Sequence, residues 1–431
     1  MKALRTLTSV VFAMMALAAN AQEGTWNGEL NVMGNKVPLV FNFSTNGCTI
    51  DSPSQGVNGI QAEKTVKDDG TISVKVGMIG ATFEGKMADG EIKGTFIQNG
   101  FPLPLTLKPG KLVVKRPQTP VPPFPYKEES VSFTNAQYTF NGTLTLPENY
   151  SKNTPVVLMV TGSGQQDRDE ELFSHKPFAV IADALARQGI ASLRYDDRGW
   201  GDKSVNFADF TTDDFRQDAA AAIPLLRKRF NKVGILGHSE GGTIAMMLAA
   251  EGKADFIVSL AGMAISGKET LIMQNRQAMT AIGLPKETVD SYCNSISKAL
   301  DEIASGKKAS EINIDDVPVA LKTITIKALQ QADTPYVRHF LTVDVGKLLP
   351  KIKCPVLALN GTKDTQVDCD ANTTRIEKGL ANCKHSIKKI DGVNHMFQHC
   401  NTGIVTEYQQ IEETIAPEVL QVVAKWIKSE S

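Results

Sequence analysis

The sequence has little that would suit a nucleic-acid-binding or metal-binding protein. Its formal net charge is −1 at pH 7, with 46 basic and 47 acidic residues, and no basic stripe is present that could contact phosphates. Six cysteines occur, but no two of them have the CxxC spacing that is common in zinc sites. We therefore expect neither a nucleic-acid partner nor a bound metal.

Long apolar runs are also missing after the N-terminus. The early run at residues 7–18 is too short to cross a bilayer comfortably. Lys2 and Arg5 give this segment a positive start, and the small residues 19–21 (Ala-Asn-Ala) follow it. This pattern is typical of a secretory signal peptide over residues 1–21 and predicts a periplasmic or secreted protein; a buried N-terminal helix is the alternative. No later run reaches about 18 apolar residues, so we expect no membrane span.

Export would permit disulfides, but the spacing of the cysteines does not assign partners. Cys369, Cys383 and Cys400 lie near the loops to which catalysis is assigned below. A bridge between two of them would brace those loops, and free thiols are the alternative.

The sequence pattern divides the rest of the chain into three regions. Residues 22–108 form short alternating runs separated by Asp-Gly turns, which predicts a small all-β domain, either a barrel or a curled sheet. Residues 109–126 are rich in proline and predict an extended linker. Residues 127–431 alternate continuous apolar runs with amphipathic helical patterns. This pattern predicts an α/β domain with a mostly parallel sheet flanked by helices.

One interval inside the α/β region breaks this alternation. Residues 264–345 carry several helical patterns between the fifth and sixth apolar runs. An insertion at that point projects from the carboxyl ends of the strands, where such sheets bind ligands. We therefore expect a helical cap over the site; a helical layer that does not reach the site is the alternative.

The clearest catalytic motif is the sequence GHSEG at residues 237–241. The apolar run 233–236 directly before it predicts a strand, and residues 243–250 after it predict a helix. A tight strand-to-helix turn needs glycine on both sides of the serine and raises the serine hydroxyl above the sheet. The motif therefore predicts Ser239 as a nucleophile; an ordinary glycine turn is the alternative.

A serine hydroxyl needs a base to accept its proton, and that base needs an acid to orient it. When the nucleophile lies on such a turn, the acid and then the base follow it along the chain. Asp364 leaves the carboxyl end of the strand-like run 356–359, and His395 lies in the loop after the run 387–390. We therefore predict Asp364 as the acid and His395 as the base. The neighbouring alternatives are His399 for the base and Asp368 or Asp370 for the acid.

The developing oxyanion needs two backbone N–H donors. One is expected from Glu240, the residue after the nucleophile. The other is expected from the glycine-rich turn at residues 161–164, which follows the first parallel strand. We predict the N–H of Ser163, with Gly164 or Gln165 as alternatives.

Charged residues gather next to this turn. Gln165 and Arg168 are candidates for contact with a polar group of the substrate, and Arg168 would favour an anionic substrate if it faced the pocket. The alternative is a structural role, because Asp167, Asp169 and Arg198 offer ion-pair partners in the same loops.

Taken together, these motifs resemble the α/β-hydrolase superfamily over residues 127–431. The turn 161–164 (TGSG), the sequence DRD at 167–169 and the sequence RYDDRG at 194–199 are similar to bacterial esterases of the EstD-like group, near the serine-aminopeptidase-like hydrolases. Thr161 stands where this family often has histidine. The resemblance implies hydrolysis of small-molecule esters with short acyl chains, without a cofactor.

Two other functions are compatible with the sequence. A peptidase or thioesterase would use the same three residues, because the leaving-group preference depends on the cap and pocket. A non-catalytic envelope protein could instead bind a glycan or lipid through its β domain, although all three triad positions are filled. The sequence carries no signal for an assembly state.

Overall fold

The structure is a computed structural model and divides the chain into two compact units, Met1–Lys115 and Arg116–Ser431. It describes residues 23–32, 35–45, 47–53, 57–98, 100–111, 115–281 and 283–430. The signal peptide predicted at residues 1–21 lies outside the described residues.

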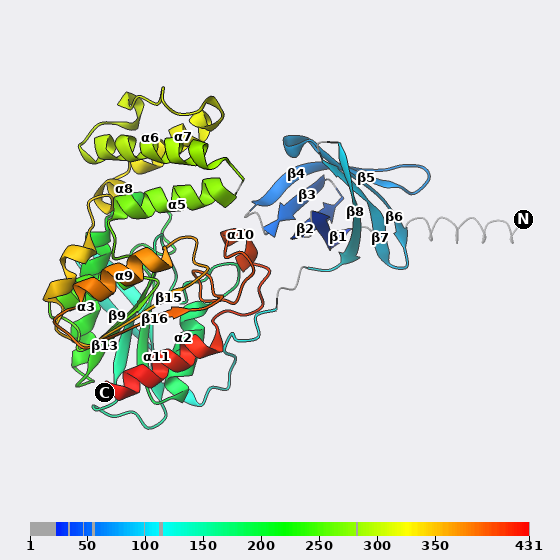
Figure 1. Cartoon of the computed structure of the whole chain (residues 1–431). Helices are drawn as coiled ribbons and strands as arrows, with labels where there is room; N and C mark the ends of the chain where they lie inside the picture. The colour runs from blue at the N-terminus through cyan, green and yellow to red at the C-terminus, as the bar shows by residue number, and fades with distance from the viewer. Residues whose placement is uncertain are drawn as a thin grey trace, which may run out of the picture. The chain divides into compact units, whose positions relative to one another are not determined.

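The first unit is a closed eight-stranded antiparallel barrel in which each strand pairs with the next and β8 pairs with β1. Its strands are β1 (Gly24–Val32), β2 (Asn35–Ser44), β3 (Gly47–Ser52), β4 (Val57–Val66), β5 (Ile72–Val76), β6 (Ala81–Ala88), β7 (Glu91–Gln98) and β8 (Phe101–Pro109). Alternate side chains point inward, as strand geometry requires. Phe41 and Phe83 meet in the interior with ring centroids 5.4 Å apart, so the barrel is filled by side chains. The predicted all-β domain is confirmed (Figure 1).

The second unit contains an eight-stranded mixed sheet in the order β16-β15-β14-β13-β11-β12-β10-β9. Its strands are β9 (Tyr126–Asn135), β10 (Tyr138–Pro147), β11 (Val156–Val160), β12 (Ala191–Tyr195), β13 (Val233–His238), β14 (Ile257–Leu260), β15 (Val356–Gly361) and β16 (His385–Ile390). The hairpin β9–β10 is antiparallel, and β10 also pairs antiparallel with β12. The six strands β11 to β16 run parallel to one another. Every residue of β11 and β13 is buried, because helices cover both faces of a parallel sheet.

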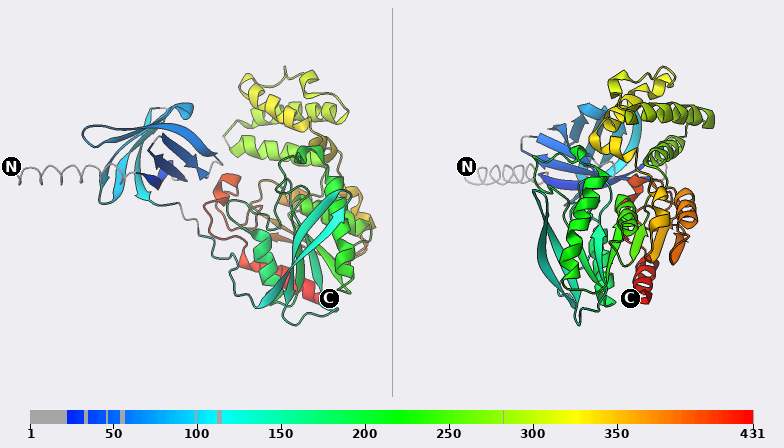
Figure 2. Two further views of the ribbon diagram at one scale, coloured as in Figure 1. Left: turned by 180° about the vertical axis from the view of Figure 1, so that it is seen from behind. Right: turned by 90° about the vertical axis from the view of Figure 1, so that its left-hand side faces the viewer.

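Helices pack on both faces of this sheet, as two separate hydrophobic clusters show. The helices are α2 (Pro177–Arg187), α3 (Thr212–Arg227), α4 (Glu240–Ala250), α9 (Cys369–Gly379), α10 (Val405–Tyr408) and α11 (Pro417–Ser429). Apolar side chains of α2 and α11 form one cluster with the sheet, and those of α3, α4 and α9 form the other. Figure 2 shows the sheet between these helices. The predicted α/β-hydrolase fold is confirmed.

The interval between β14 and β15 forms a helical cap. Its helices are α5 (Gly267–Ala281), α6 (Lys286–Ala304), α7 (Lys322–Ala332) and α8 (Pro335–Phe340). These helices have a core of their own, in which Tyr292 and Ile303 are fully buried. Figures 1 and 2 show α5, α6 and α7 stacked beyond one end of the sheet. The predicted helical insertion is therefore present.

The proline-rich segment before β9 packs on the second unit. Arg116 donates hydrogen bonds to the carbonyl oxygens of Gln409 and Ile411, each 2.8 to 2.9 Å long. Gln118 donates a bond of 2.7 Å to the carbonyl oxygen of Ile415. The part of the predicted linker from Arg116 onward is thus fixed against the loop before α11.

Two further observations bear on the sequence predictions. None of the described helices is both long and apolar enough to span a membrane. The six cysteines, all within the described residues, are unbridged.

Candidate active site

Ser239 occupies the turn between β13 and α4, as the GHSEG motif predicts. Its backbone has φ 54° and ψ −120°, and α4 begins at the next residue, Glu240. A side chain at Gly237 would overlap the backbone of Gly241, and a side chain at Gly241 would overlap the backbone of Val160. The glycines therefore permit a close approach of strand, turn and helix, and a left-handed backbone at a non-glycine residue is typical of a functional site.

Asp364 and His395 lie within hydrogen-bond distance of each other. His395 Nδ1 is 2.8 Å from Asp364 Oδ2, and both side chains are buried. The other carboxylate oxygen of Asp364 accepts the backbone N–H groups of Gln366 and Val367 at 2.8 Å. These bonds fix the carboxylate, which in turn orients the imidazole and leaves its Nε2 atom for a substrate or nucleophile.

A cavity of about 330 Å³ contains both Ser239 and His395 in its lining. Ser163 contributes to one wall, and Tyr336 and Phe340 of the cap helix α8 contribute to another. The cap therefore reaches the site. A larger depression of about 970 Å³ has Asp364 in its lining, but neither Ser239 nor His395.

The alternative triad residues have other partners. His399 is about half exposed and lies 2.9 Å from Glu413. Asp368 accepts the N–H of Ala371 at the start of α9, and Asp370 pairs with Lys389 at 2.5 Å. His395 lines the cavity that contains Ser239 and His399 does not, and it is Asp364 whose carboxylate lies 2.8 Å from the ring of His395.

The oxyanion donors predicted from the sequence lie next to the nucleophile. Ser163 lines the cavity, and Glu240 is the first residue of α4. Within the described residues, the backbone N–H groups of Ser163 and Glu240 have no hydrogen-bond acceptor. The N–H of Gly162 is already used, because it donates to Glu170 Oε1 at 2.7 Å.

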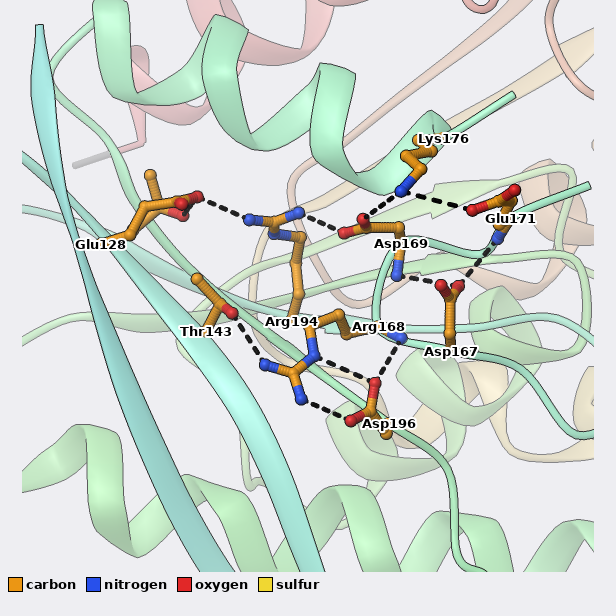
Figure 3. Close-up of polar contacts among 10 residues, drawn as sticks. Glu128, Thr143, Asp167, Arg168, Asp169, Glu171, Lys176, Arg194 and Asp196 are labelled. Carbon is orange, nitrogen blue, oxygen red and sulfur yellow. Dashed lines mark hydrogen bonds and ion pairs between the residues drawn. The ribbon is translucent and has the colours of Figure 1, made fainter. Parts of the chain in front are cut away.

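The predicted substrate contacts Gln165 and Arg168 point elsewhere. Arg168 donates to Asp196 Oδ1 at 3.0 Å and to Thr143 Oγ1 at 2.9 Å, as Figure 3 shows. Gln165 donates to the carbonyl oxygen of Arg198 at 2.8 Å, and the next residue, Gln166, lines the cavity in its place. In this geometry Arg168 and Gln165 brace the loops, which is the structural alternative stated above.

The other charged residues of this loop form a connected network (Figure 3). Arg194 pairs with Glu128 at 2.8 Å and with Asp169, and Lys176 pairs with Asp169 at 3.6 Å. Asp167 accepts backbone N–H groups within its own loop, including that of Asp169. The network fixes the segment between β11 and α2, which carries the oxyanion turn and Glu170.

The contacts of two buried carboxylates near Ser239 were not predicted from the sequence, which indicated Glu240 only as a backbone donor and gave Glu170 no role. The carboxylate of Glu240 accepts hydrogen bonds of 2.6 Å from Thr212 and from Tyr336 of the cap. Burial raises the pKa of Glu240 above its ordinary value. Glu170 contacts His238 Nδ1 at 3.0 Å. No spacing rule connects these residues, because each pair joins segments that are far apart along the chain.

A family model described as "Serine aminopeptidase, S33" matches residues 174–399, just over half of the chain. This chain belongs to that family. The match begins after the oxyanion turn and includes all three predicted triad positions, so the chain is a serine hydrolase by descent as well as by motif. The predicted resemblance to this group is confirmed.

The chain is also similar to individual known proteins. The esterase EstD of Thermotoga maritima is 27% identical over 305 residues, which covers 69% of this chain and 68% of EstD. The human serine hydrolase BPHL is 25% identical over 252 residues, which covers 55% of this chain and 72% of BPHL. Among solved structures, Est1E from Butyrivibrio proteoclasticus matches with a TM-score of 0.43 at 16% identity, over 70% of this chain and 98% of Est1E.

The described residues contain no group of three or more histidine, cysteine, aspartate or glutamate side chains that could hold a metal ion.

Proposed function

We propose that this chain is an exported serine esterase that cleaves small-molecule esters with short acyl chains. The observation that carries the proposal is that His395, which lies 2.8 Å from the buried carboxylate of Asp364, lines the same cavity as Ser239. The relative EstD is named as an esterase, which supports an ester as the substrate.

The proposed reaction passes through an acyl-enzyme. His395 accepts the hydroxyl proton while Ser239 attacks the ester carbonyl carbon, and the N–H groups of Ser163 and Glu240 stabilise the oxyanion. His395 then gives the proton to the leaving alcohol. Water attacks the acyl-enzyme by the same route, with His395 again as the base, and releases the acid and the free serine. Asp364 holds the imidazole in the orientation that both steps need.

A panel of chromogenic short-chain acyl esters tests this proposal. We expect Ser239→Ala to lower kcat by at least about 1,000-fold and Asp364→Asn to lower it by about 1,000- to 10,000-fold, with little change in folding. Ser132→Ala changes an exposed serine of β9 and is the control. Full activity in the Ser239→Ala variant would refute the assignment.

An aminopeptidase is the second candidate, because the matching family model carries that description. Thioesters and aminoacyl amides in the same panel distinguish these substrates. A fluorophosphonate probe then tests whether the chain is an enzyme at all: labelling at Ser239 supports every hydrolase, whereas a folded and unlabelled protein favours a glycan- or lipid-binding role.

Export to the periplasm or beyond rests on the N-terminal sequence alone. Cell fractionation of the full chain and of a variant without residues 1–21 tests it. We expect the full chain outside the cytoplasm, shortened at its N-terminus, and the truncated variant inside. Recovery of the uncleaved full chain in the cytoplasm would contradict the proposal.

A further inference from the structure

A second histidine–carboxylate contact lies directly behind the nucleophile. His238, the residue before Ser239, has its Nδ1 atom 3.0 Å from Glu170 Oε1 and its Nε2 atom 2.9 Å from the carbonyl oxygen of His395. The same Glu170 oxygen accepts the N–H of Gly162 at 2.7 Å. One pair of side chains therefore contacts the oxyanion turn, the nucleophile turn and the loop of the general base.

We propose that Glu170 and His238 form a buried ion pair that positions these three loops for catalysis. The inference rests on the proposed function for its catalytic consequence, whereas the charge state of the pair is independent of it. Neither residue contacts the reacting atoms in the proposed mechanism, so both are positioning residues.

The hydrogen-bond partners of His238 define its protonation. A carbonyl oxygen only accepts, so the contact with His395 requires a proton on Nε2 of His238. In the proposed pair Glu170 is ionised, so its Oε1 atom accepts both the N–H of Gly162 and the N–H at Nδ1 of His238. Both ring nitrogens then carry protons, and His238 is an imidazolium.

Burial and backbone geometry agree with a fixed role for this pair. Glu170 and His238 are 4% and 7% exposed. Glu170 has φ 53°, a left-handed conformation that costs energy at a non-glycine residue and marks functional sites. Gly162 separates the carboxylate from the nucleophile: a Cβ atom placed there would be 3.2 Å from both Glu170 Oε1 and the Cβ atom of Ser239.

The charges around His238 favour its protonated form. The groups that face it are the carboxylate of Glu170, the ring of His395 with centroids 4.8 Å apart, and the carboxylate of Asp364 beyond that ring. Burial acts to lower the pKa of His238, but Glu170 and the other partners outweigh it and raise the pKa above the ordinary value. This shift favours the imidazolium form of His238 over that of an exposed histidine at the same pH.

The catalytic consequence follows from what the pair holds. The Gly162 amide precedes the N–H of Ser163, and the His395 carbonyl belongs to the residue whose ring must meet Ser239. Without the carboxylate charge, His238 becomes neutral and carries a proton on only one ring nitrogen. It can then donate to the residue at position 170 or to the carbonyl oxygen of His395, but not to both. The substrate cavity stays intact, so the effect should fall on kcat rather than on KM.

Nitrogen-15 NMR of the histidine rings tests the charge state directly. The His238 resonance is assigned by its absence in His238→Gln. We expect imidazolium shifts for His238 at pH 7.5 in the wild-type protein. Shifts of a neutral ring at that pH would overturn the proposed ion pair, whatever reaction the enzyme catalyses. The measurement is made on the wild-type protein and does not depend on a Glu170 variant that folds.

The kinetic test uses Glu170→Gln with Glu128→Gln as the matched control. Glu128 likewise has a basic partner, Arg194, but it does not line the cavity that contains Ser239. We expect Glu170→Gln to lower kcat by about 10- to 100-fold with KM nearly unchanged, and to return His238 to a neutral ring. Wild-type kcat in Glu170→Gln, with His238 neutral, would overturn the positioning role. Inactivity of the wild-type protein on every substrate would instead count against the proposed function alone.

Discussion

Acidification should destabilise the second unit through His175. This side chain is 1% exposed. Its Nε2 atom lies 3.0 Å from the carbonyl oxygen of Tyr408 and 3.0 Å from the amide nitrogen of Gln398, and its Nδ1 atom lies 2.9 Å from Thr414 Oγ1. These contacts suit a neutral ring, and burial lowers the pKa of His175 from 6.5 to about 4.

The sign and size of the effect follow from this difference. Below pH 6.5 the unfolded chain binds a proton at His175, whereas the folded chain does so only near pH 4. The stabilisation is therefore fully present above pH 6.5 and is lost as the pH falls toward 4. Since one pKa unit corresponds to about 1.4 kcal/mol, the loss amounts to about 3 kcal/mol in the free energy of unfolding.

Urea unfolding at pH 7 and pH 4 measures this loss, with the fluorescence of Trp200 and Trp426 reporting on the second unit. Comparison with His175→Gln cancels the contributions of all other groups, so the stability advantage of the wild type should shrink by about 3 kcal/mol at pH 4. His399→Gln removes an exposed histidine and should keep the wild-type pH dependence. An equal fall in stability for the wild type and His175→Gln would refute the reasoning.

Three further outcomes follow from single contacts. Tyr336→Phe removes the hydroxyl that donates to Glu240 and should lower the free energy of unfolding by about 1–3 kcal/mol in urea, because a buried carboxylate oxygen loses its partner; an unchanged midpoint would show that the contact contributes nothing. Gly241→Ala places a methyl group against a main-chain carbonyl oxygen and should cost about 3 kcal/mol in the same assay, whereas wild-type stability would contradict the packing. Cys354 and Cys383 are free thiols in the structure, but each lies two residues before a paired position of β15 and β16, so oxidation outside the cytoplasm should join them, seen as the loss of two hydrogens in the intact mass; free thiols at both positions in the exported protein would contradict this prediction.

The fold was predictable because its main signals are local. The sequence runs in β11 and β13 are apolar because helices bury both faces of the sheet, and a run of this kind can be recognised from the sequence alone. The turn at Ser239 was equally recognisable, because its glycines lie two positions to either side of Ser239 and their close packing leaves no room for a side chain. Period-two alternation likewise predicted the all-β character of the first unit, but it left open whether the strands form a barrel or a curled sheet.

The supporting residues of the site were not predictable by this route. Glu170 meets His238 across 68 positions of the chain, and Tyr336 meets Glu240 across 96. Such contacts depend on how whole loops pack, which no local pattern encodes. The role of Arg168 could not be predicted for the same reason. Its sequence context was compatible with both a substrate contact and an ion pair, and only the position of Asp196 in the structure distinguishes the two.

The two residues that flank Ser239 link the nucleophile to separate parts of the unit. His238 is held by Glu170 in the loop after β11, and Glu240 is held by Thr212 of α3 and Tyr336 of the cap. The strained backbone of Ser239 therefore depends on contacts from both sides of the turn. Since Glu240 also supplies a proposed oxyanion N–H, a shift of the cap at Tyr336 would move a catalytic donor as well as a wall of the substrate cavity. Substitutions that displace this part of the cap should consequently alter kcat together with KM, whereas a cap that only selected substrates would alter KM alone.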